Sequence, residues 1–377
     1  MKILIDNSNL NVGGGIQVAT SFLEDLKTLD LQNQLDGFSD IYVIQSANSS
    51  KQIQKNTFGK KFKFYDLYTD SEKSIYKRRK IVKNIEDEVK PEIIFTVFGP
   101  SYHRSAVPKI VGFAIPHLIY TDSPYFDSLS LLSRIKTYFT YTIKNYCFLK
   151  NSNVLIFESE KANQIYTSKN KIKSYTVNNT LNSVFENREI WENINIKKSN
   201  FDILCLSANY PHKNLKVIPQ IIDYILETNK LTDFKFHISG VKESFGFSEK
   251  HNKFINYLGH VKLEMLPSLY SHMDCLFMPT LLEVFSTTYL EAMFMKVPIL
   301  SSDMEFARDI CGNAAIFCNP TDVEEYAKNI LILYNDPTLR KNLIQKGEQN
   351  LKRFGNSLQR TKQYIEIIKN TKNANKG

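Results

Sequence analysis

The sequence predicts an α/β protein built from two Rossmann-like, doubly wound domains, and three observations lead to this prediction. The chain has 377 residues, which suits two domains of roughly 150 to 200 residues better than one. Short apolar segments alternate with amphipathic helical segments, and this alternation runs twice along the chain. A polar stretch without a strand pattern separates the two runs. We therefore predict a first domain over 1–185, a linker over 186–200 and a second domain over 201–356.

The first half contains short apolar segments with the length of buried strands, at 2–6, 41–45, 61–65, 93–97, 109–114 and 154–158. Helical periodicity is clear between several of them, at 16–27 and 75–89. Apolar strands separated by helices predict a parallel sheet with helices on both faces.

The second half repeats this order. Its strand-like segments are 202–207, 235–239, 255–258, 275–279, 299–301 and 315–317, with helices near 215–228, 288–294 and 323–334. A last amphipathic helix is expected at 357–369, packed back on the first domain. Ligands of doubly wound sheets bind at the carboxyl ends of the strands, so we expect the two domains to face each other across a cleft lined by those ends.

Basic residues are concentrated in the predicted first domain of a chain whose net charge is +9. Residues 51–80 hold Lys51, Lys55, Lys60, Lys61, Lys63, Lys73, Lys77, Arg78, Arg79 and Lys80 against Asp66, Asp70 and Glu72. A second stretch interleaves basic and aromatic residues, namely Arg134, Lys136, Tyr138, Phe139, Tyr141, Lys144 and Tyr146. Such a surface suits anionic lipid headgroups or a diphosphate-lipid, although a solvated basic surface without a partner fits equally well. It carries no recognised nucleic-acid motif, so no nucleic-acid partner is expected.

The remaining sequence features predict a cytoplasmic protein that needs no metal. The chain opens on a strand pattern rather than a signal peptide, and no run of about 18 apolar residues predicts a transmembrane helix. The cysteines form no C-x-x-C pair, the histidines show no ligand spacing and no clear D-x-D occurs. We expect no cofactor or metal, and peripheral association with the inner face of the plasma membrane as the possible second location.

Two glutamates mark a predicted strand–loop–helix junction. Glu283 is expected in the loop, and Glu291 about one turn into the helix. The start of a helix offers backbone N–H groups that suit a phosphate, and carboxylates nearby accept hydrogen bonds from sugar hydroxyls. Thr288 and Glu291 also have the spacing of a capping box, which needs no ligand. Spacing alone leaves both interpretations open.

The order of motifs around these glutamates resembles the donor domain of family 4 glycosyltransferases, whose fold is called GT-B. The series is YLGHV at 257–261, LPSLY at 266–270, DCLFMP at 274–279, the two glutamates, and VPILSSD at 297–303. The resemblance is specific over 203–334 and looser over 1–185. It implies a retaining transferase that uses a nucleotide diphosphate sugar, with the acceptor in the first domain.

The resemblance also implies roles for single residues. Glu283 would contact the hydroxyls of the donor sugar, and Glu291 the ribose. Backbone groups of Phe285, Ser286 and Thr287 would face the sugar and diphosphate, and those of Gly259, His260 and Val261 the base. Family members usually have glycine where this chain has Ser286, which a negative φ would accommodate.

A second polar segment, SANYPHK at 207–213, follows the first strand of the predicted second domain. Family members carry an arginine and, five positions later, a lysine that face the diphosphate. Lys213 matches the lysine, and Asn209 lies within the same donor-binding loop, but the position of the arginine is occupied by Ala208. Positive charge is needed to neutralise a departing diphosphate, so His212 or a basic residue of the first domain is expected to compensate.

Two candidates remain in the predicted first domain. Gly14 and Gly15 belong to a triple glycine between the first strand and helix, where backbone can approach a phosphate, although a tight turn explains them equally well. His117 follows an apolar strand, and the resemblance places it beside the reacting sugar; a buried structural histidine is the alternative. The sequence thus predicts a glycosyltransferase that extends a glycan or lipid-linked glycan, such as a bacterial surface polysaccharide or lipopolysaccharide precursor. A nucleotide-sugar epimerase and a non-catalytic relative are the alternatives.

Overall fold

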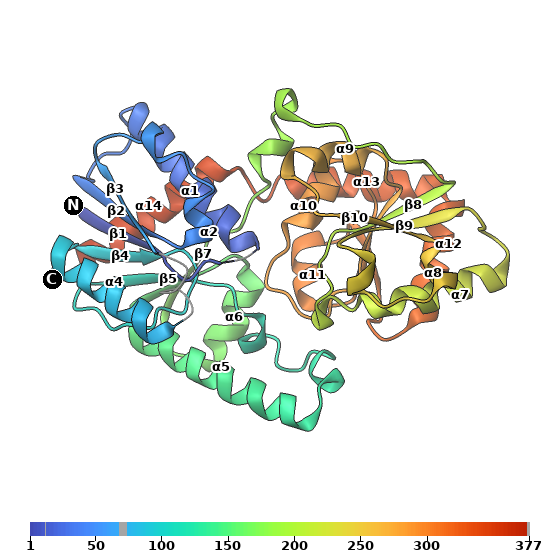
Figure 1. Cartoon of the computed structure of the whole chain (residues 1–377), viewed down its shortest axis with the longest axis horizontal. Coiled ribbons are helices and arrows are strands. Elements are labelled where there is room, and N and C mark those ends of the chain that lie inside the picture. Colours follow the sequence, from blue (N-terminus) through green and yellow to red (C-terminus); the bar gives the residue numbers. More distant parts are fainter. Residues whose placement is uncertain (12, 68–73, 375–377) are drawn as a thin grey trace. The chain divides into compact units, whose positions relative to one another are not determined.

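The computed structural model describes residues 1–11, 13–67 and 74–374 of the chain (Figure 1). Lys73, Asp70 and Glu72 of the basic stretch lie outside these residues. The chain divides into two compact units, each described here by itself. The first comprises Met1–Ile119, Leu131–Asn179 and Asn356–Gly377, and the second comprises Tyr120–Ser130 and Thr180–Gly355. The segment Tyr120–Ser130 therefore belongs to the second unit, although it falls inside the predicted range 1–185.

The first unit is built on a seven-stranded sheet with the order β3-β2-β1-β4-β5-β6-β7, and every recorded pairing is parallel. The strands are β1 (Lys2–Asn7), β2 (Asp40–Gln45), β3 (Phe62–Asp66), β4 (Ile93–Thr96), β5 (Lys109–Phe113), β6 (Val154–Phe157) and β7 (Lys173–Thr176). Strand β7 was missed by the sequence analysis because its residues are polar or half-exposed, as an edge strand permits.

Helices cover both faces of this sheet, as Figure 1 shows. They are α1 (Gly14–Leu31), α2 (Ala47–Ser50), α4 (Ile75–Val89), α5 (Leu131–Asn151), α6 (Glu160–Lys169) and α14 (Ser357–Ala374). Helices α1 and α14 share one apolar core, where the rings of Phe22 and Tyr364 meet edge to face at 5.5 Å. Helix α4 contributes Val82 and Ile85 to a smaller core on the opposite face of β1 and β2. The helix at the end of the chain therefore belongs to the first unit.

The second unit holds a six-stranded sheet with the order β10-β9-β8-β11-β12-β13, again with parallel pairings. Its strands are β8 (Phe201–Cys205), β9 (Phe234–Ser239), β10 (Ile255–Gly259), β11 (Cys275–Met278), β12 (Ile299–Ser302) and β13 (Ala315–Cys318). Its helices are α7 (Ile218–Thr228), α8 (Glu249–Asn252), α9 (Leu266–Ser271), α10 (Thr287–Phe294), α11 (Glu305–Cys311), α12 (Val323–Asn335) and α13 (Pro337–Leu351).

Both strand orders place a topological switch point inside the sheet. The order reverses between β1 and β4 in the first unit, and between β8 and β11 in the second. Loops that leave two such strands diverge to opposite faces and open a crevice at the carboxyl edge, which is where ligands of doubly wound sheets bind. Within the described part of the chain, no helix has both the length and the apolar character needed to cross a bilayer.

Candidate functional site

The candidate site of the second unit lies at the switch point of its sheet. The loop after β8 carries Lys213, and the loop after β11 carries Glu283. The Lys213 Nζ lies 2.6 Å from Glu283 Oε2, so an ion pair joins the two loops that diverge from the switch point. The Lys213 side chain is 15% exposed and the Glu283 side chain 24%. A fixed cation and a fixed carboxylate therefore stand together where the fold offers a ligand crevice.

Local backbone geometry holds this ion pair in place. Lys213 ends a short 3-10 helix, Pro211–Lys213, and Asn214 follows in the left-handed conformation with φ +57°. The backbone N–H of Leu281 donates to the carbonyl oxygen of His212 at 2.7 Å, which ties the loop after β11 to the loop after β8. Asparagine tolerates the left-handed region better than most residues, so this turn follows from the sequence.

The surroundings of His212 disfavour a positive charge on its ring. Its ring stacks on Tyr210 with centroids 5.6 Å apart, and burial, followed by the neighbouring Lys213 charge, lowers the pKa of the imidazole. A lowered pKa favours the neutral ring at pH 7. A neutral imidazole can still donate one hydrogen bond to a phosphate, so the role of His212 in place of the missing arginine stays a prediction.

Glu291 is buried near the middle of α10, one turn after its first residue. Its side chain accepts a hydrogen bond from the Tyr270 hydroxyl at 3.0 Å and another from the Thr287 hydroxyl at 3.1 Å. Burial raises the pKa of this carboxyl to about 7, although both hydrogen bonds oppose the shift. A carboxyl group with two oxygens keeps further acceptor capacity beyond these two bonds, so it can still bind hydroxyl groups of a ligand.

The capping-box interpretation of Thr288 and Glu291 is wrong. Helix α10 begins at Thr287, after Ser286 as N-cap, and no side chain caps it. Thr288 thus lies inside the helix, and the Glu291 carboxyl is bound by Tyr270 and Thr287 instead. The helix begins two residues earlier than the capping box requires, which leaves Glu291 available for another purpose.

The start of α10 presents backbone N–H groups at the same edge of the sheet. Ser286 has φ −123° and ψ 118°, which is ordinary extended backbone, so this position does not require the glycine that family members carry. The Phe285 ring packs edge to face against Phe354 with centroids 5.8 Å apart. These contacts fix the segment Phe285, Ser286 and Thr287 that the sequence analysis assigned to donor binding.

The remaining predicted residues of this unit also lie at carboxyl ends of strands. Gly259 closes β10 with φ +64° and exchanges backbone hydrogen bonds with Gly240 after β9, at 2.9 and 3.0 Å. His260 and Val261 follow directly. The Asn209 amide donates to the Ser244 carbonyl oxygen at 2.6 Å, which links the loops after β8 and β9. A positive φ favours glycine at position 259, and the pair with Gly240 fixes the end of β10.

The predicted residues of the first unit lie at the edge of the other sheet. Gly14 and Gly15 open α1 after β1, and a side chain at Gly15 would approach Phe98 to 3.3 Å. His117 lies in a short 3-10 helix after β5, Pro116–Leu118. Its ring stacks on Tyr141 of α5 with centroids 4.0 Å apart and planes 12° apart. The first unit therefore presents these groups at its own carboxyl edge.

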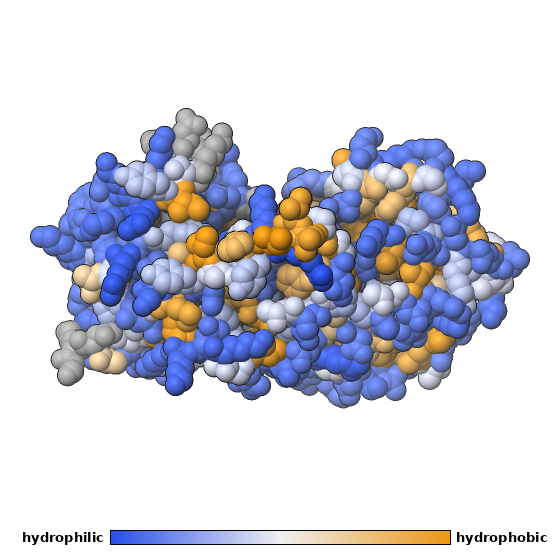
Figure 2. Space-filling model, turned by 90° about the horizontal axis from the view of Figure 1, so that it is seen from below, coloured by the Kyte–Doolittle hydropathy of each residue, from blue (hydrophilic) through white to orange (hydrophobic). Residues whose placement is uncertain are grey.

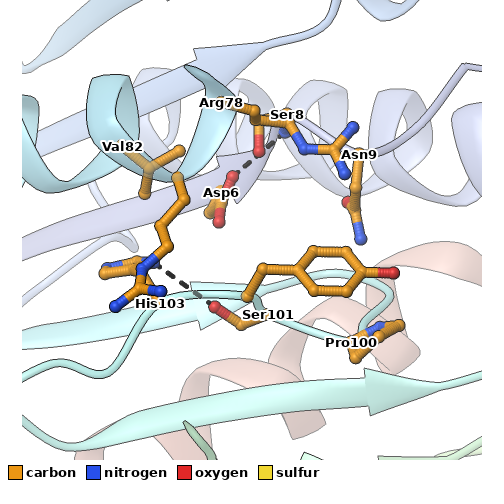
Figure 3. A pocket seen from close by; sticks show the side chains of 10 residues that line it. Asp6, Ser8, Asn9, Arg78, Val82, Pro100, Ser101 and His103 are labelled. Carbon is orange, nitrogen blue, oxygen red and sulfur yellow. Dashed lines mark hydrogen bonds between the residues drawn. The ribbon is translucent and has the colours of Figure 1, made fainter. Parts of the chain in front are cut away.

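A polar hollow at the switch point of the first unit was missed by the sequence analysis. Figure 3 shows side chains that line it: Asp6, Ser8, Asn9, Arg78, Arg79, Val82, Pro100, Ser101, Tyr102 and His103. Asp6 accepts a hydrogen bond from the backbone N–H of Ser8 at 3.0 Å. Arg78 and Arg79 were counted only as members of the basic stretch, because their positions on α4 give no sign that they meet the loops after β1 and β4.

A buried network of charges supports this hollow. His103 Nε2 lies 2.8 Å from Glu86 Oε2. The Lys109 ammonium donates to Ser101 Oγ at 3.0 Å and to the His103 carbonyl oxygen at 2.7 Å. Burial lowers the pKa of Lys109 to about 8, and the charges of Asp6 and Glu86 oppose the shift. Among the residues that the structure describes, no three His, Cys, Asp or Glu side chains gather in a way that could hold a metal ion.

Comparison with known proteins finds a family model that matches most of the second unit. Residues 186–350 match the model of the family described as Glycosyl transferases group 1. O-antigen chain mannosyltransferase B of Escherichia coli is 32% identical over 100 residues, 26% of this chain and 26% of the relative. O-antigen chain mannosyltransferase RfbU of Salmonella typhimurium is 26% identical over 198 residues, 51% of this chain and 48% of the relative. The chain thus spans about half, or less, of the curated relatives it matches.

Solved structures resemble the whole chain in fold. HepE from Anabaena, in complex with UDP and glucose, matches with a TM-score of 0.68 at 11% identity, covering 98% of this chain and 100% of that one. Sucrose-phosphate synthase from Thermosynechococcus elongatus matches with a TM-score of 0.69 at 12% identity, covering 99% of each chain. The predicted fold, two Rossmann-like domains of the GT-B class, is confirmed, and so is the resemblance to glycosyltransferases that the motif series indicated.

Proposed function

We propose, from the match of residues 186–350 to the glycosyl transferases group 1 family, that this protein is a glycosyltransferase. It moves a sugar from a nucleoside diphosphate to a hydroxyl group of a glycan acceptor. The observation that carries the proposal is the Lys213–Glu283 ion pair at the switch point of the second sheet, with Glu291 buried in the same loop–helix segment. In this arrangement Lys213 is available for the diphosphate, Glu283 for the sugar and Glu291 for the ribose of a nucleotide sugar.

The proposed roles follow from the chemistry of each group. The Lys213 ammonium and the backbone N–H groups at the start of α10 stabilise the negative charge on the departing diphosphate. The Glu283 carboxylate accepts hydrogen bonds from hydroxyls of the donor sugar, and the Glu291 carboxyl binds the hydroxyls of the ribose. Gly259, His260 and Val261 contact the base through their backbone, and no metal takes part.

We propose that the reaction retains the configuration of the sugar. The bond between the anomeric carbon and the phosphate oxygen breaks, the acceptor oxygen bonds to that carbon from the same face, and the acceptor proton passes to the departing phosphate. His117 positions the reacting sugar and is not required as a base. The anomeric configuration of the product, measured by proton coupling in NMR, tests this step, since inversion would exclude it.

The acceptor is proposed to be a lipid-linked glycan of a bacterial surface polysaccharide. Two relatives are named for mannosyl transfer to O-antigen chains, which supports this class of acceptor. The hollow of the first unit suits the phosphate of such an acceptor, because two arginines and the hydroxyl groups of Ser8, Ser101 and Tyr102 line it.

Replacing Arg79 by glutamine is therefore expected to raise the KM for a phosphate-bearing acceptor about fivefold, since one charge-assisted hydrogen bond is lost. The KM for the donor should not change. Lys80→Gln is the matched control, because Lys80 is the next exposed cation on α4 and does not line the hollow. Steady-state kinetics with acceptor varied at saturating donor would give the answer, and equal effects of both variants would contradict the assignment.

Restoring the missing arginine is expected to strengthen nucleotide binding. Ala208 is exposed at the carboxyl edge of β8, so Ala208→Arg has room to reach a bound diphosphate. One added charge-assisted hydrogen bond predicts about tenfold tighter binding of the nucleoside diphosphate. Titration calorimetry compares this variant with Ala208→Gln, which adds length without charge. An Arg variant that binds no better than the Gln variant would speak against the placement of the diphosphate.

Turnover assays separate the proposed function from its alternatives. Purified protein is incubated with nucleotide sugars, including GDP-mannose and UDP-glucose, with and without a lipid-linked glycan. A transferase releases nucleoside diphosphate only with acceptor, and the mass of the acceptor increases by one sugar. An epimerase converts the donor without acceptor. Absence of both changes with every donor would support a non-catalytic protein.

A further inference from the structure

Helix α5 exposes an unusual amount of apolar surface. Leu131, Leu132, Ile135, Tyr138, Phe139, Ile143 and Tyr146 each keep between 46% and 80% of their surface exposed. Phe148 is the only buried residue of this 21-residue helix. Figure 2 is turned so that the side of the first unit on which α5 lies in Figure 1 faces the reader, and it shows apolar side chains exposed on that side. Contiguous exposed apolar surface of this kind marks a binding surface.

The helix attaches to the first unit by its opposite side. The Phe148 ring packs on Phe113 at 4.4 Å, and Asn145 accepts a hydrogen bond from the Tyr166 hydroxyl at 2.5 Å. Tyr141 stacks on His117. At 100° per residue, the seven exposed apolar residues fall within an arc of roughly 140°, and the attached residues fall within a separate arc. The exposed apolar residues therefore form one continuous face of the helix, separate from the face that packs on the first unit.

The charges of α5 select one kind of partner. The helix contains Arg134, Lys136, Lys144 and Lys150 and no acidic residue. Arg79, which lines the polar hollow, lies close enough to α5 to influence the titration of Cys147. A second copy of the chain docked through the same helix would offer no acidic side chain of that helix to pair with these cations. Apolar and aromatic side chains flanked by cations fit an anionic bilayer surface, where rings sit at headgroup level and cations meet phosphates.

We propose that α5 is an interfacial helix by which the protein binds an anionic lipid bilayer, lying in the headgroup region with its exposed apolar face inserted. The inference rests in part on the proposed function, since it brings the hollow lined by Arg79 to the surface that carries a lipid-linked acceptor. The stack of Tyr141 on His117 connects this helix directly to a residue assigned to the reaction. Binding to vesicles, however, requires neither donor nor acceptor, so it is measured independently of catalysis.

The test is flotation of the full chain with vesicles of phosphatidylglycerol and phosphatidylcholine, compared with vesicles of phosphatidylcholine alone. The wild type should bind the anionic vesicles and bind much less to the neutral ones. Leu132→Ser combined with Phe139→Ser should lower partitioning about 100-fold, since each buried apolar side chain contributes about tenfold. Lys136→Gln combined with Lys150→Gln should lower it about 25-fold, at about fivefold for each cation.

Leu31→Ser combined with Ile332→Ser is the matched control, because both side chains are exposed apolar residues on other helices. This control should bind as the wild type does. Thermal unfolding and stabilisation by nucleoside diphosphate show that each variant is folded, and the cation variant tests the proposal even if the apolar variant misfolds. Three results would overturn it: no binding of the wild type to anionic vesicles, equal binding by the α5 variants, or dimers in sedimentation that the α5 variants abolish without any vesicle binding.

Discussion

Replacement of Lys213 by alanine is expected to lower kcat by about 100- to 1,000-fold, the loss typical when one fixed donor to a developing anion is removed. The Lys213 ammonium is held at 2.6 Å from Glu283, and Ala208 leaves this loop without a second family cation. Of the two positions that carry a cation in family members, only Lys213 can therefore neutralise the departing diphosphate. Rates of nucleoside diphosphate release at saturating donor and acceptor measure the effect.

Two further variants show whether charge at this position is what matters. Lys213→Arg keeps the charge, so its kcat should be at least a tenth of the wild-type kcat. The planar guanidinium changes the geometry of the pair, so some loss of kcat is expected. Lys216→Ala removes an exposed cation three positions away and should leave kcat unchanged. A kcat for Lys213→Ala within threefold of the wild type would contradict the role of this ion pair.

Replacement of Glu291 by glutamine is expected to separate stability from nucleotide binding. Burial raises the pKa of Glu291 to about 7, above its ordinary value of 4.5. Between these two values the folded state keeps the proton that the unfolded state releases, so stability falls as pH rises through this window and levels off above about 7. Glutamine has no proton to lose. From pH 4 to pH 8 the unfolding free energy of the wild type should therefore fall by about 3 kcal/mol more than that of the variant.

The same variant should bind nucleoside diphosphates at least tenfold more weakly, because an NH2 group, which cannot accept a hydrogen bond, replaces one of the two carboxyl oxygens proposed to bind the ribose hydroxyls. Urea unfolding at several pH values, with and without nucleotide, measures both effects on one sample. Tyr270→Phe serves as control for packing, since it removes one hydrogen bond to Glu291 and leaves the carboxyl group itself in place. A wild type and a Glu291→Gln variant with the same pH dependence of stability would contradict the buried, protonated carboxyl.

Local patterns were enough to predict most of the fold. Each apolar run became a parallel strand, because strands buried on both faces need continuous apolar sequence. Strand β7 was not predicted because an edge strand does not need a continuous apolar sequence. The assignment of Tyr120–Ser130 to the second unit could not be predicted either. It depends on contacts such as the Ser123 hydroxyl donating to the Leu281 carbonyl oxygen at 2.6 Å, across 158 positions of sequence.

The candidate site shows the same limit. Motif order placed Lys213, Glu283 and Glu291 in one loop system, but spacing alone could not decide between a capping box and a ligand site. That choice depended on where α10 begins and on Tyr270, which lies 21 positions before Glu291. The hollow beside Arg78 and Arg79 could not be predicted from the sequence, because its lining comes from three separate segments, 6–9, 78–82 and 100–103, that meet only in the folded unit.

The central claim is that the carboxyl edge of the second sheet binds a nucleoside diphosphate sugar without a metal. Thermal unfolding of the wild type and Glu291→Gln, with a panel of nucleoside diphosphates and nucleotide sugars in the presence of chelator, tests it most directly. Ligand at a hundredfold excess over its Kd should stabilise the wild type by about 2.7 kcal/mol. We expect this shift with the nucleotides of one base, and its loss in the variant. If no nucleotide stabilises the wild type, with or without magnesium, the site does not bind a donor and the proposed function is wrong.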